Sequence, residues 1–296
     1  MVSYSELSYA KINLHLEVGS MRGDGYHNLS TLFQLVDMYD EITLSVTKCS
    51  TYAVECLITG DFDLENNTMV RAAKLFNEKT SLNGVVTIEA NKNIPIGAGL
   101  GGGSSNAATV LALLNKAYNY PLSKRELLEL AIQVGSDVPF FMRGRATALA
   151  TGRGEELLPI RSREDLWALV VVPKSFSIST KVAYQNIVRK ENLKLSLREL
   201  KEIYNKSCDK WIYYNDFKPY LELKSDFYKS VENITFDHPG AFGTISGCGS
   251  SYVVISESKP LLKEVEAKIG QNRLESSQYL IKCLHQSNLG ATVFVR

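Results

Sequence analysis

The stretch from Ile94 to Ala117 carries the clearest chemical signal in the sequence. It contains Gly97, Gly99, Gly101, Gly102 and Gly103, followed by Ser104, Ser105 and an apolar run at helical spacing. Glycine has no Cβ, so such a loop lets backbone N–H groups approach a ligand closely. The free N–H groups and the dipole of a helix N-terminus attract an anion to the same place. The stretch therefore predicts a phosphate-binding loop, with Ser104 or Ser105 capping the helix.

Three other interpretations of this loop are weaker. The spacing Gly97-x-Gly99-x-x-Gly102 fits a dinucleotide fingerprint, but Pro95 interrupts the preceding run, and the next acids fall in a helical pattern instead of ending a strand. A Walker A loop needs a lysine directly after its glycines, and none follows here. A ligand-free turn would not need so many glycines and serines at one helix start.

Two charged residues outside the loop are candidates for catalysis. Lys11 and Asn13 share one face of an alternating strand predicted over 8–18. Asp137 follows a predicted helix end in the segment GSDVPFF (135–141) and could accept a proton from a substrate hydroxyl. From this segment alone, an ordinary turn aspartate is favoured over a catalytic one.

Two further loops could contact a ligand. The Asp24-Gly25 turn presents Tyr26 and His27, which could stack on a ring or hydrogen-bond to it, although a surface loop explains them equally well. Residues 243–251, GTISGCGSS, form a second glycine-rich loop that contains Cys248. A small residue tolerated beside a ligand is favoured there over a reactive thiol.

The composition limits the class of protein. The chain has 296 residues, 45% of them hydrophobic, and a net charge of +1, which predicts a globular protein that does not bind nucleic acid. No stretch is apolar enough to span a membrane and the N-terminus lacks a signal-peptide pattern. The five cysteines are scattered without metal-ligand spacing, so we expect a cytoplasmic protein.

The predicted elements mix strands and helices and suggest two domains, 1–160 and 161–296. The boundary lies in the polar segment near 160–165. Strands are predicted over 8–18, 32–36, 40–46, 85–90, 167–173, 252–255, 279–284 and 291–295, with two short strands around a Gly-x-Gly turn in 146–159. Helices are predicted over 66–78, 107–117, 124–134 and 260–270, with one more opening at the Ser196–Glu199 capping box.

These features together resemble the GHMP kinase superfamily. The loop reads PIGAGLGGGSSNAA (95–108) where the family has P-x-x-x-G-L-G-S-S-A-A. The resemblance covers nearly the whole chain and implies an α+β fold: an N-terminal domain like the second domain of ribosomal protein S5 and a ferredoxin-like C-terminal domain. AKINL (10–14), RGDGYH (22–27), GSDVPFF (135–141) and SGCGSS (246–251) are most similar to the members that use ATP to phosphorylate the 2-hydroxyl of 4-diphosphocytidyl-2-C-methyl-D-erythritol in non-mevalonate isoprenoid synthesis.

The resemblance also implies roles for individual residues. Asp137 takes the place of the catalytic aspartate and Lys11 that of the lysine beside it, a cation that would stabilise the carboxylate. The implied ATP-binding residues are Asn67, Pro95, Gly97, Ala98, Gly99, Leu100, Gly101, Gly102, Gly103, Ser104 and Ser105. The implied substrate-binding residues are Asn13, Tyr26, His27, Tyr184, Gly247 and Gly249, with Tyr184 stacking on cytosine.

The implied ligands are ATP, Mg²⁺ with no protein ligand assigned, and a small molecule carrying a cytidine diphosphate. A monomer or weak homodimer is expected. The alternatives are another GHMP kinase, such as a mevalonate or homoserine kinase, or a non-catalytic nucleotide-binding regulator of the same fold. The DGYH turn with Tyr184 disfavours the first, and the presence of both Lys11 and Asp137 disfavours the second. An oxidoreductase would rest on the glycine spacing alone.

Overall fold

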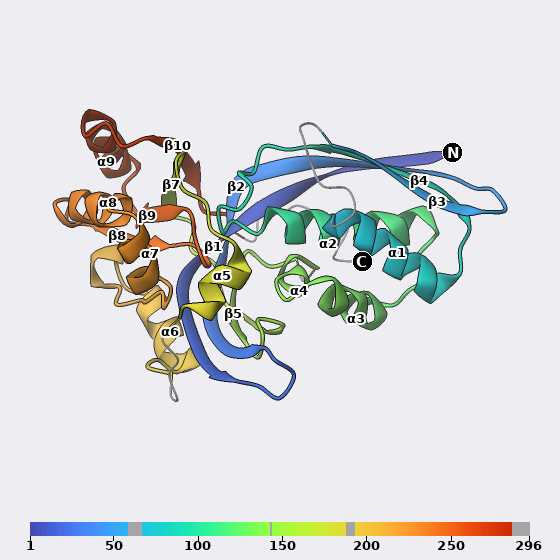
Figure 1. Cartoon of the computed structure of the whole chain (residues 1–296), viewed down its shortest axis with the longest axis horizontal. Helices are drawn as coiled ribbons and strands as arrows, with labels where there is room; N and C mark the ends of the chain where they lie inside the picture. Colours follow the sequence, from blue (N-terminus) through green and yellow to red (C-terminus); the bar gives the residue numbers. More distant parts are fainter. Residues whose placement is uncertain (59–66, 143, 188–192, 286–296) are drawn as a thin grey trace.

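Two β-sheets with helices packed on them form the molecule (Figure 1). The computed structural model describes residues 1–58, 67–142, 144–187 and 193–285. All strands up to Pro159 belong to the first sheet and all described strands from Trp167 onwards to the second. The predicted domain boundary near residue 160 falls in the connection between them and stays a prediction.

A long hairpin of β1 (Val2–Met21) and β2 (His27–Thr47) is the backbone of the first sheet. Strand β2 also pairs with β4 (Gly84–Asn91) near one end and with β5 (Thr147–Thr151) near the other. Strands β3 (Tyr52–Ile58) and β6 (Glu156–Pro159) form the edges of this path. The two strands predicted over 32–36 and 40–46 are one strand. Tyr9 pairs with Tyr39 and Ala10 with Val36, so residues 37 and 38 form a bulge and the pairing continues on both sides of it.

Helices α1 to α4 cover one face of the first sheet (Figure 1). Their bounds are α1 (Thr68–Thr80), α2 (Gly102–Ala117), α3 (Lys124–Val134) and α4 (Val138–Met142). Helix α1 begins after Asn67, whose side chain caps it by accepting the Met69 N–H. The capping box of Ser123 and Glu126 is present at the start of α3. Helix α2 is the central one, with most of its residues buried.

The second sheet is antiparallel, with strand order β10-β7-β9-β8. Its strands are β7 (Trp167–Pro173), β8 (Ala241–Ile245), β9 (Tyr252–Ser256) and β10 (Ser276–Lys282). Helices α5 to α8 lie between β7 and β8, and α9 (Lys259–Gln271) lies between β9 and β10. This βαββαβ order is the ferredoxin-like arrangement, which confirms that expectation for the C-terminal half.

The sequence did not predict several elements of the second half. They are α5 (Thr180–Gln185), α7 (Lys218–Lys224), α8 (Phe227–Phe236) and strand β8. In the first half, β3 and α4 were also missed. Helix α6 (Leu197–Tyr204) begins at the predicted capping box of Ser196 and Glu199. The strand predicted over 291–295 lies outside the described residues. Within the described ranges, no helix is long and apolar enough to cross a membrane.

Both faces of the second sheet are buried. Ala168, Val170 and Val253 point into a core shared with β1 and β2, whereas Leu169 and Val171 point into a core shared with α7, α8 and α9. Because side chains alternate across a strand, the near-continuous apolar run WALVVVP (167–173) can supply both cores. The second sheet therefore packs directly on the β1–β2 hairpin, which fixes the junction where the candidate site lies.

We expect Leu111→Ala in α2 to destabilise the fold by about 2–5 kcal/mol, because its fully buried side chain would leave a cavity between the helices and the first sheet. Leu223→Ala, at a position 83% exposed, is the matched control and should change the unfolding free energy by less than about 0.5 kcal/mol. Denaturant titration of both variants checks this, and equal losses would contradict the core assigned here.

Candidate active site

A large cavity opens at the junction of the two sheets. It has a volume of about 1150 Å³ and is lined from both halves of the chain. The predicted residues on its lining are Lys11, Asn13, Tyr26, His27, Asn67, Pro95, Gly97, Ala98, Gly99, Leu100, Gly101, Gly102, Gly103, Ser104, Asp137, Tyr184 and Gly247. The structure thus brings together residues that lie more than 200 positions apart in the sequence.

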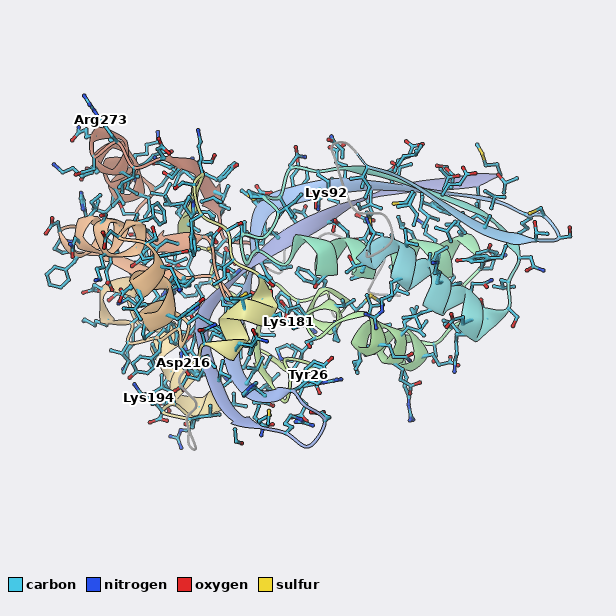
Figure 2. All side chains as sticks on the ribbon, in the orientation of Figure 1. Tyr26, Lys92, Lys181, Lys194, Asp216 and Arg273 are labelled. Atoms are coloured by element: carbon cyan, nitrogen blue, oxygen red, sulfur yellow. The ribbon has the colours of Figure 1, made fainter. Side chains whose placement is uncertain are left out.

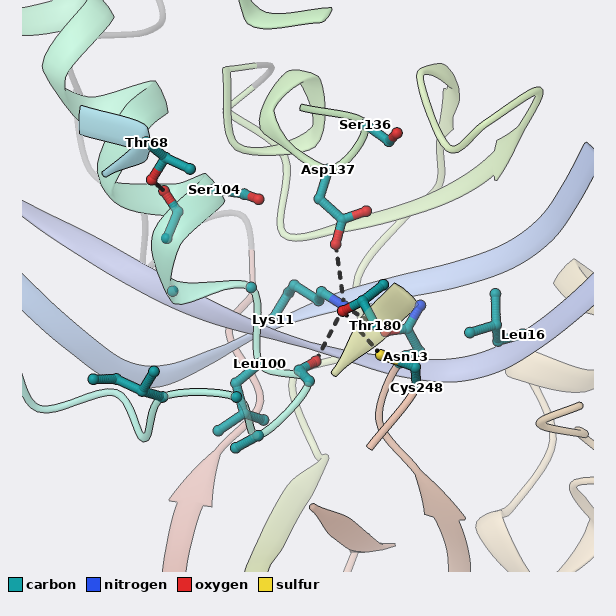
Figure 3. Close-up of a pocket in the computed structure, with 18 of the residues that line it drawn as sticks. Lys11, Asn13, Leu16, Thr68, Leu100, Ser104, Ser136, Asp137, Thr180 and Cys248 are labelled. Carbon is teal, nitrogen blue, oxygen red and sulfur yellow. Dashed lines mark hydrogen bonds and ion pairs between the residues drawn. The ribbon is translucent and has the colours of Figure 1, made fainter. Parts of the chain in front are cut away.

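The ammonium group of Lys11 lies at the centre of this lining (Figure 3). Its Nζ is 3.4 Å from Asp137 Oδ2, and it donates to Asn13 Oδ1 at 2.5 Å and to the Gly99 carbonyl at 3.2 Å. The Lys11 side chain is only 4% exposed, whereas the Asp137 side chain is 32% exposed. The lysine is therefore held in place by three partners, while its carboxylate partner remains accessible from the cavity.

A β-bulge in β1 shapes the wall next to Lys11. Asn13 pairs with Phe33 and His15 with Leu32, so Leu14 is an extra residue without a cross-strand partner. Residues three apart in a regular strand point to opposite faces. Here Asn13 and Leu16 both line the cavity, because the bulge reverses the alternation. The Asn13 amide then donates to Thr31 Oγ1 at 2.8 Å, which fixes its orientation.

The first glycine loop ends in an uncapped helix. Helix α2 begins at Gly102 with Gly101 as its N-cap, at φ +70°, and no side chain caps it. The prediction that Ser104 or Ser105 caps this helix was wrong, since glycine can take the left-handed conformation and start the helix earlier. An uncapped N-terminus leaves N–H groups without a protein partner. The lining from Gly101 to Ser104 therefore has the character of an anion site.

The two glycine loops are fastened to each other. Ser246 Oγ donates to the Gly99 carbonyl at 2.9 Å and accepts the Asn13 N–H at 3.2 Å. The N–H and hydroxyl of Ser251 both donate to the Ala98 carbonyl, at 3.2 and 2.6 Å. A Cβ on Gly99 would lie 2.1 Å from the Ser246 carbonyl oxygen, so only glycine permits this approach.

A buried polar network supports the start of the first loop. The Asp40 carboxylate is fully buried and accepts the backbone N–H groups of Asn93 and Ile94 at 2.7 and 2.9 Å. It also forms an ion pair with Lys92, which donates to Asn106 Oδ1 at 2.7 Å. Buried charges are tolerated when they are paired and fully hydrogen-bonded in this way. The network holds the chain just before Pro95 against α2.

Aromatic rings form the far end of the cavity. The rings of His27 and Tyr184 are stacked, with centroids 5.8 Å apart and an interplanar angle of 29°. Tyr184 also packs edge-on against Phe217 at 4.9 Å. Burial raises the pKa of Tyr184, and the negative charge of Asp137 adds to this effect, so the phenol stays neutral at physiological pH. Tyr26 and Lys181, labelled in Figure 2, line this end as well.

Two predicted contacts do not reach the lining. Ser105 is buried, and its hydroxyl accepts a hydrogen bond from Ser8 at 2.8 Å instead of facing the cavity. Gly249 packs against Leu221 and Ile178. Both residues therefore lie on the side of their glycine loops that faces away from the cavity.

Three cationic residues of the lining were missed in the sequence: Lys92, Arg153 and Lys181. Lys92 lies two residues after the strand predicted over 85–90. Arg153 lies in the Gly152-x-Gly154 turn, with its guanidinium 4.6 Å from the ring centroid of Tyr26. The position of Arg153 between two glycines could have indicated a cation presented on a turn to a ligand. Nothing in the sequence, however, indicated that this turn lies against the loop of Tyr26.

We expect Gly99→Ala to destabilise the protein more than Gly97→Ala. Both glycines have positive φ, so each alanine costs about 1–2 kcal/mol of backbone strain. Only at Gly99 does the added Cβ meet the backbone of the second loop, since nothing lies within 4 Å of it at Gly97. Thermal unfolding of both variants checks this, and equal losses would show that the two loops are not in contact.

Comparison with known proteins places the chain in a family. Residues 67–145 match the model of the GHMP kinases N terminal domain. The chain is 38% identical to the 4-diphosphocytidyl-2-C-methyl-D-erythritol kinase of Chlorobium limicola (85% of this chain, 88% of that protein) and 34% identical to that of a Nostoc species (92% of each). A crystal structure of 4-(cytidine 5'-diphospho)-2C-methyl-D-erythritol kinase superposes with a TM-score of 0.75 at 29% identity, over 94% of this chain and 99% of that one. The match confirms the predicted α+β GHMP kinase fold, and the chain belongs to the 4-diphosphocytidyl-2-C-methyl-D-erythritol kinase family of the GHMP kinases.

Proposed function

We propose that the protein transfers the γ-phosphoryl group of ATP to the 2-hydroxyl of 4-diphosphocytidyl-2-C-methyl-D-erythritol, a step in non-mevalonate isoprenoid synthesis. The family relationship supports the activity. The observation that carries the proposal is the Lys11–Asp137 pair, which lies in one cavity with an uncapped helix N-terminus and an aromatic wall. A phosphoryl donor and an acceptor with an aromatic base can therefore meet at the pair.

ATP would bind along the first glycine loop. Its phosphates would contact the N–H groups from Gly97 to Ser104, where the dipole of α2 adds a favourable potential. Asn67 lies at the start of α1, and the Thr68 hydroxyl donates to the Gly103 carbonyl at 2.8 Å. This contact holds the N-termini of α1 and α2 side by side, so Asn67 would contact the adenine end of the nucleotide.

The acceptor would bind from the opposite end. Its cytosine would stack on the Tyr184 ring and meet Tyr26 and His27, while Gly247 and Asn13 would lie beside its phosphate or erythritol part. The His27 Nδ1 lies 3.0 Å from the Gly19 carbonyl, so the ring's orientation is already fixed. Such a preformed wall lowers the cost of ordering the ligand.

The reaction requires positioning and charge stabilisation. The acceptor hydroxyl attacks the γ-phosphorus while the bond to the ADP oxygen breaks, and the hydroxyl proton passes to the Asp137 carboxylate. Lys11, held by Asn13 and Gly99, supplies positive charge where the phosphoryl oxygens gain negative charge. A lysine fixed before the substrate binds needs no reorganisation during the reaction.

The lining also fits Mg²⁺ carried by the nucleotide. In the described part of the chain, no group of three or more His, Cys, Asp or Glu could hold a metal on its own. Mg²⁺ usually keeps several waters and binds through one or two carboxylates and the substrate phosphates. We propose the Ser104 hydroxyl as its protein oxygen, because the Asp137 carboxylate is paired with Lys11 and accepts the proton. Bound there, the ion would neutralise charge on the phosphates.

The remaining properties are part of the same proposal. A net charge of +1 and unpaired cysteines support a cytoplasmic enzyme that binds small molecules and not nucleic acid. We propose that it acts as a monomer or weak homodimer, because a single chain supplies both the glycine loop for the phosphates and the aromatic wall for the acceptor.

We expect the purified protein to release ADP with ATP, Mg²⁺ and 4-diphosphocytidyl-2-C-methyl-D-erythritol, but not with mevalonate or homoserine. Asp137→Asn should lower kcat about 10²–10⁴-fold, because the amide cannot accept the proton. Asp226→Asn, at an exposed position whose side chain caps nothing, is the control and should keep full activity. Turnover of mevalonate or homoserine, and not of the cytidyl substrate, would show that the proposed acceptor is wrong. ATP binding without turnover of any acceptor would favour a non-catalytic nucleotide-binding regulator.

We expect Tyr184→Ala to raise the KM for the cytidyl acceptor about 5–150-fold, which corresponds to the roughly 1–3 kcal/mol that one stacked base contributes. Tyr184→Phe keeps the ring face and should stay near the wild-type value. Steady-state kinetics with each substrate varied in turn checks this. An equal loss in the phenylalanine variant would show that the hydroxyl, and not stacking, matters.

A further inference from the structure

Asn215 is a buried residue whose side-chain amide uses almost all of its hydrogen-bonding capacity. Its Nδ2 donates to the carbonyls of Ile245 and Gly247, at 2.7 and 2.8 Å, and its Oδ1 accepts the Phe217 N–H at 2.9 Å. The residue is 7% exposed and does not line the cavity. A side-chain amide combines two N–H donors with an acceptor, which neither aspartate nor a hydroxyl can do. The site therefore specifically requires an amide.

The backbone around Asn215 is attached to the strand that carries Lys11. The Leu16 N–H donates to the Tyr214 carbonyl at 2.8 Å, and the Asp216 N–H donates to the Leu16 carbonyl at 3.0 Å. The Asp216 carboxylate, labelled in Figure 2, accepts the Val18 N–H at 2.9 Å. Asn215 thus has a fixed position relative to β1, and it transmits that position to the second glycine loop.

The bond to Gly247 also orients a peptide group. Because a trans peptide is planar, the N–H of Cys248 points away from the Gly247 carbonyl and hence away from Asn215. Within the described ranges, no protein group accepts this N–H. Gly247 and Cys248 both line the cavity, and Gly247 has φ +58°. The N–H is therefore free to donate to a ligand.

We infer that Asn215 is a positioning residue: it holds the second glycine loop on β1 and turns the Gly247–Cys248 peptide so that its N–H binds an anionic or hydroxyl oxygen of the acceptor. The inference rests on the proposed function for the identity of that acceptor. The first glycine loop has anchors of its own, because the Lys11 N–H donates to the Leu100 carbonyl and Asp40 holds Asn93 and Ile94. Loss of the Asn215 amide should therefore affect the acceptor more than ATP.

Asn215→Asp and Asn215→Ala test this inference. We expect each to raise the KM for the cytidyl acceptor about tenfold or more, since two buried carbonyls lose their donors, while the KM for ATP changes less than about threefold. Asn205→Asp is the matched control, because Asn205 is exposed and makes one local bond to the Lys201 carbonyl, and its kinetics should not change. An unchanged acceptor KM in a folded variant, or equal losses for both substrates, would overturn the positioning role.

Hydrogen–deuterium exchange separates this inference from the proposed function. Without any ligand, peptides covering 246–251 should exchange faster in both Asn215 variants than in wild type or Asn205→Asp, and equal exchange would refute the inference even if the acceptor were misassigned. If neither Asn215 variant folds, hydrogen–deuterium exchange of the wild-type protein with and without the acceptor tests the inference. Adding the acceptor should slow exchange in 246–251, and no slowing in a protein that turns the acceptor over would overturn the inference.

Discussion

The contact between the two glycine loops is the constraint on which the site depends. Gly99 and Ser246 come from opposite halves of the chain, and their backbones approach so closely that a single Cβ would separate them. The same Gly99 carbonyl accepts from Lys11, and the same Ser246 hydroxyl accepts from Asn13. One contact therefore sets both the position of the ammonium group and the closure of the two sheets around the cavity.

Buried polar groups make this contact rigid. Asp40 holds the entry to the first loop and Asn215 holds the second, each with all or nearly all of its hydrogen-bonding capacity used. A third buried residue, Gln34, accepts hydrogen bonds from Thr147 and Tyr204 and donates one to the Leu284 carbonyl, which ties the first sheet to α6 and to the segment after β10. Fully hydrogen-bonded networks of this kind favour one arrangement, because any shift would leave a buried polar atom without a hydrogen-bond partner.

The sequence predicted those parts of the site that depend on local chemistry. The glycine loop, the capping box at Ser196 and the shared face of Lys11 and Asn13 follow from short-range rules, and the structure has all of them. The joining of two predicted strands into β2 and the placement of Arg153 depend on pairing between distant segments. Such pairing leaves no periodic signal, and short helices such as α5 and α7 carry too few residues to show one.

The bulge at Leu14 gives β1 an unusual sensitivity to length. Upstream of it, Lys11 and Asn13 face the cavity, and downstream of it Leu16 does, while His15 and Glu17 are buried behind the strand. Substitutions in β1 change one side chain at a time, but the loss or gain of a single residue there would exchange the two faces for every position beyond it. A natural or engineered variant can therefore alter the composition of this strand far more readily than its residue count.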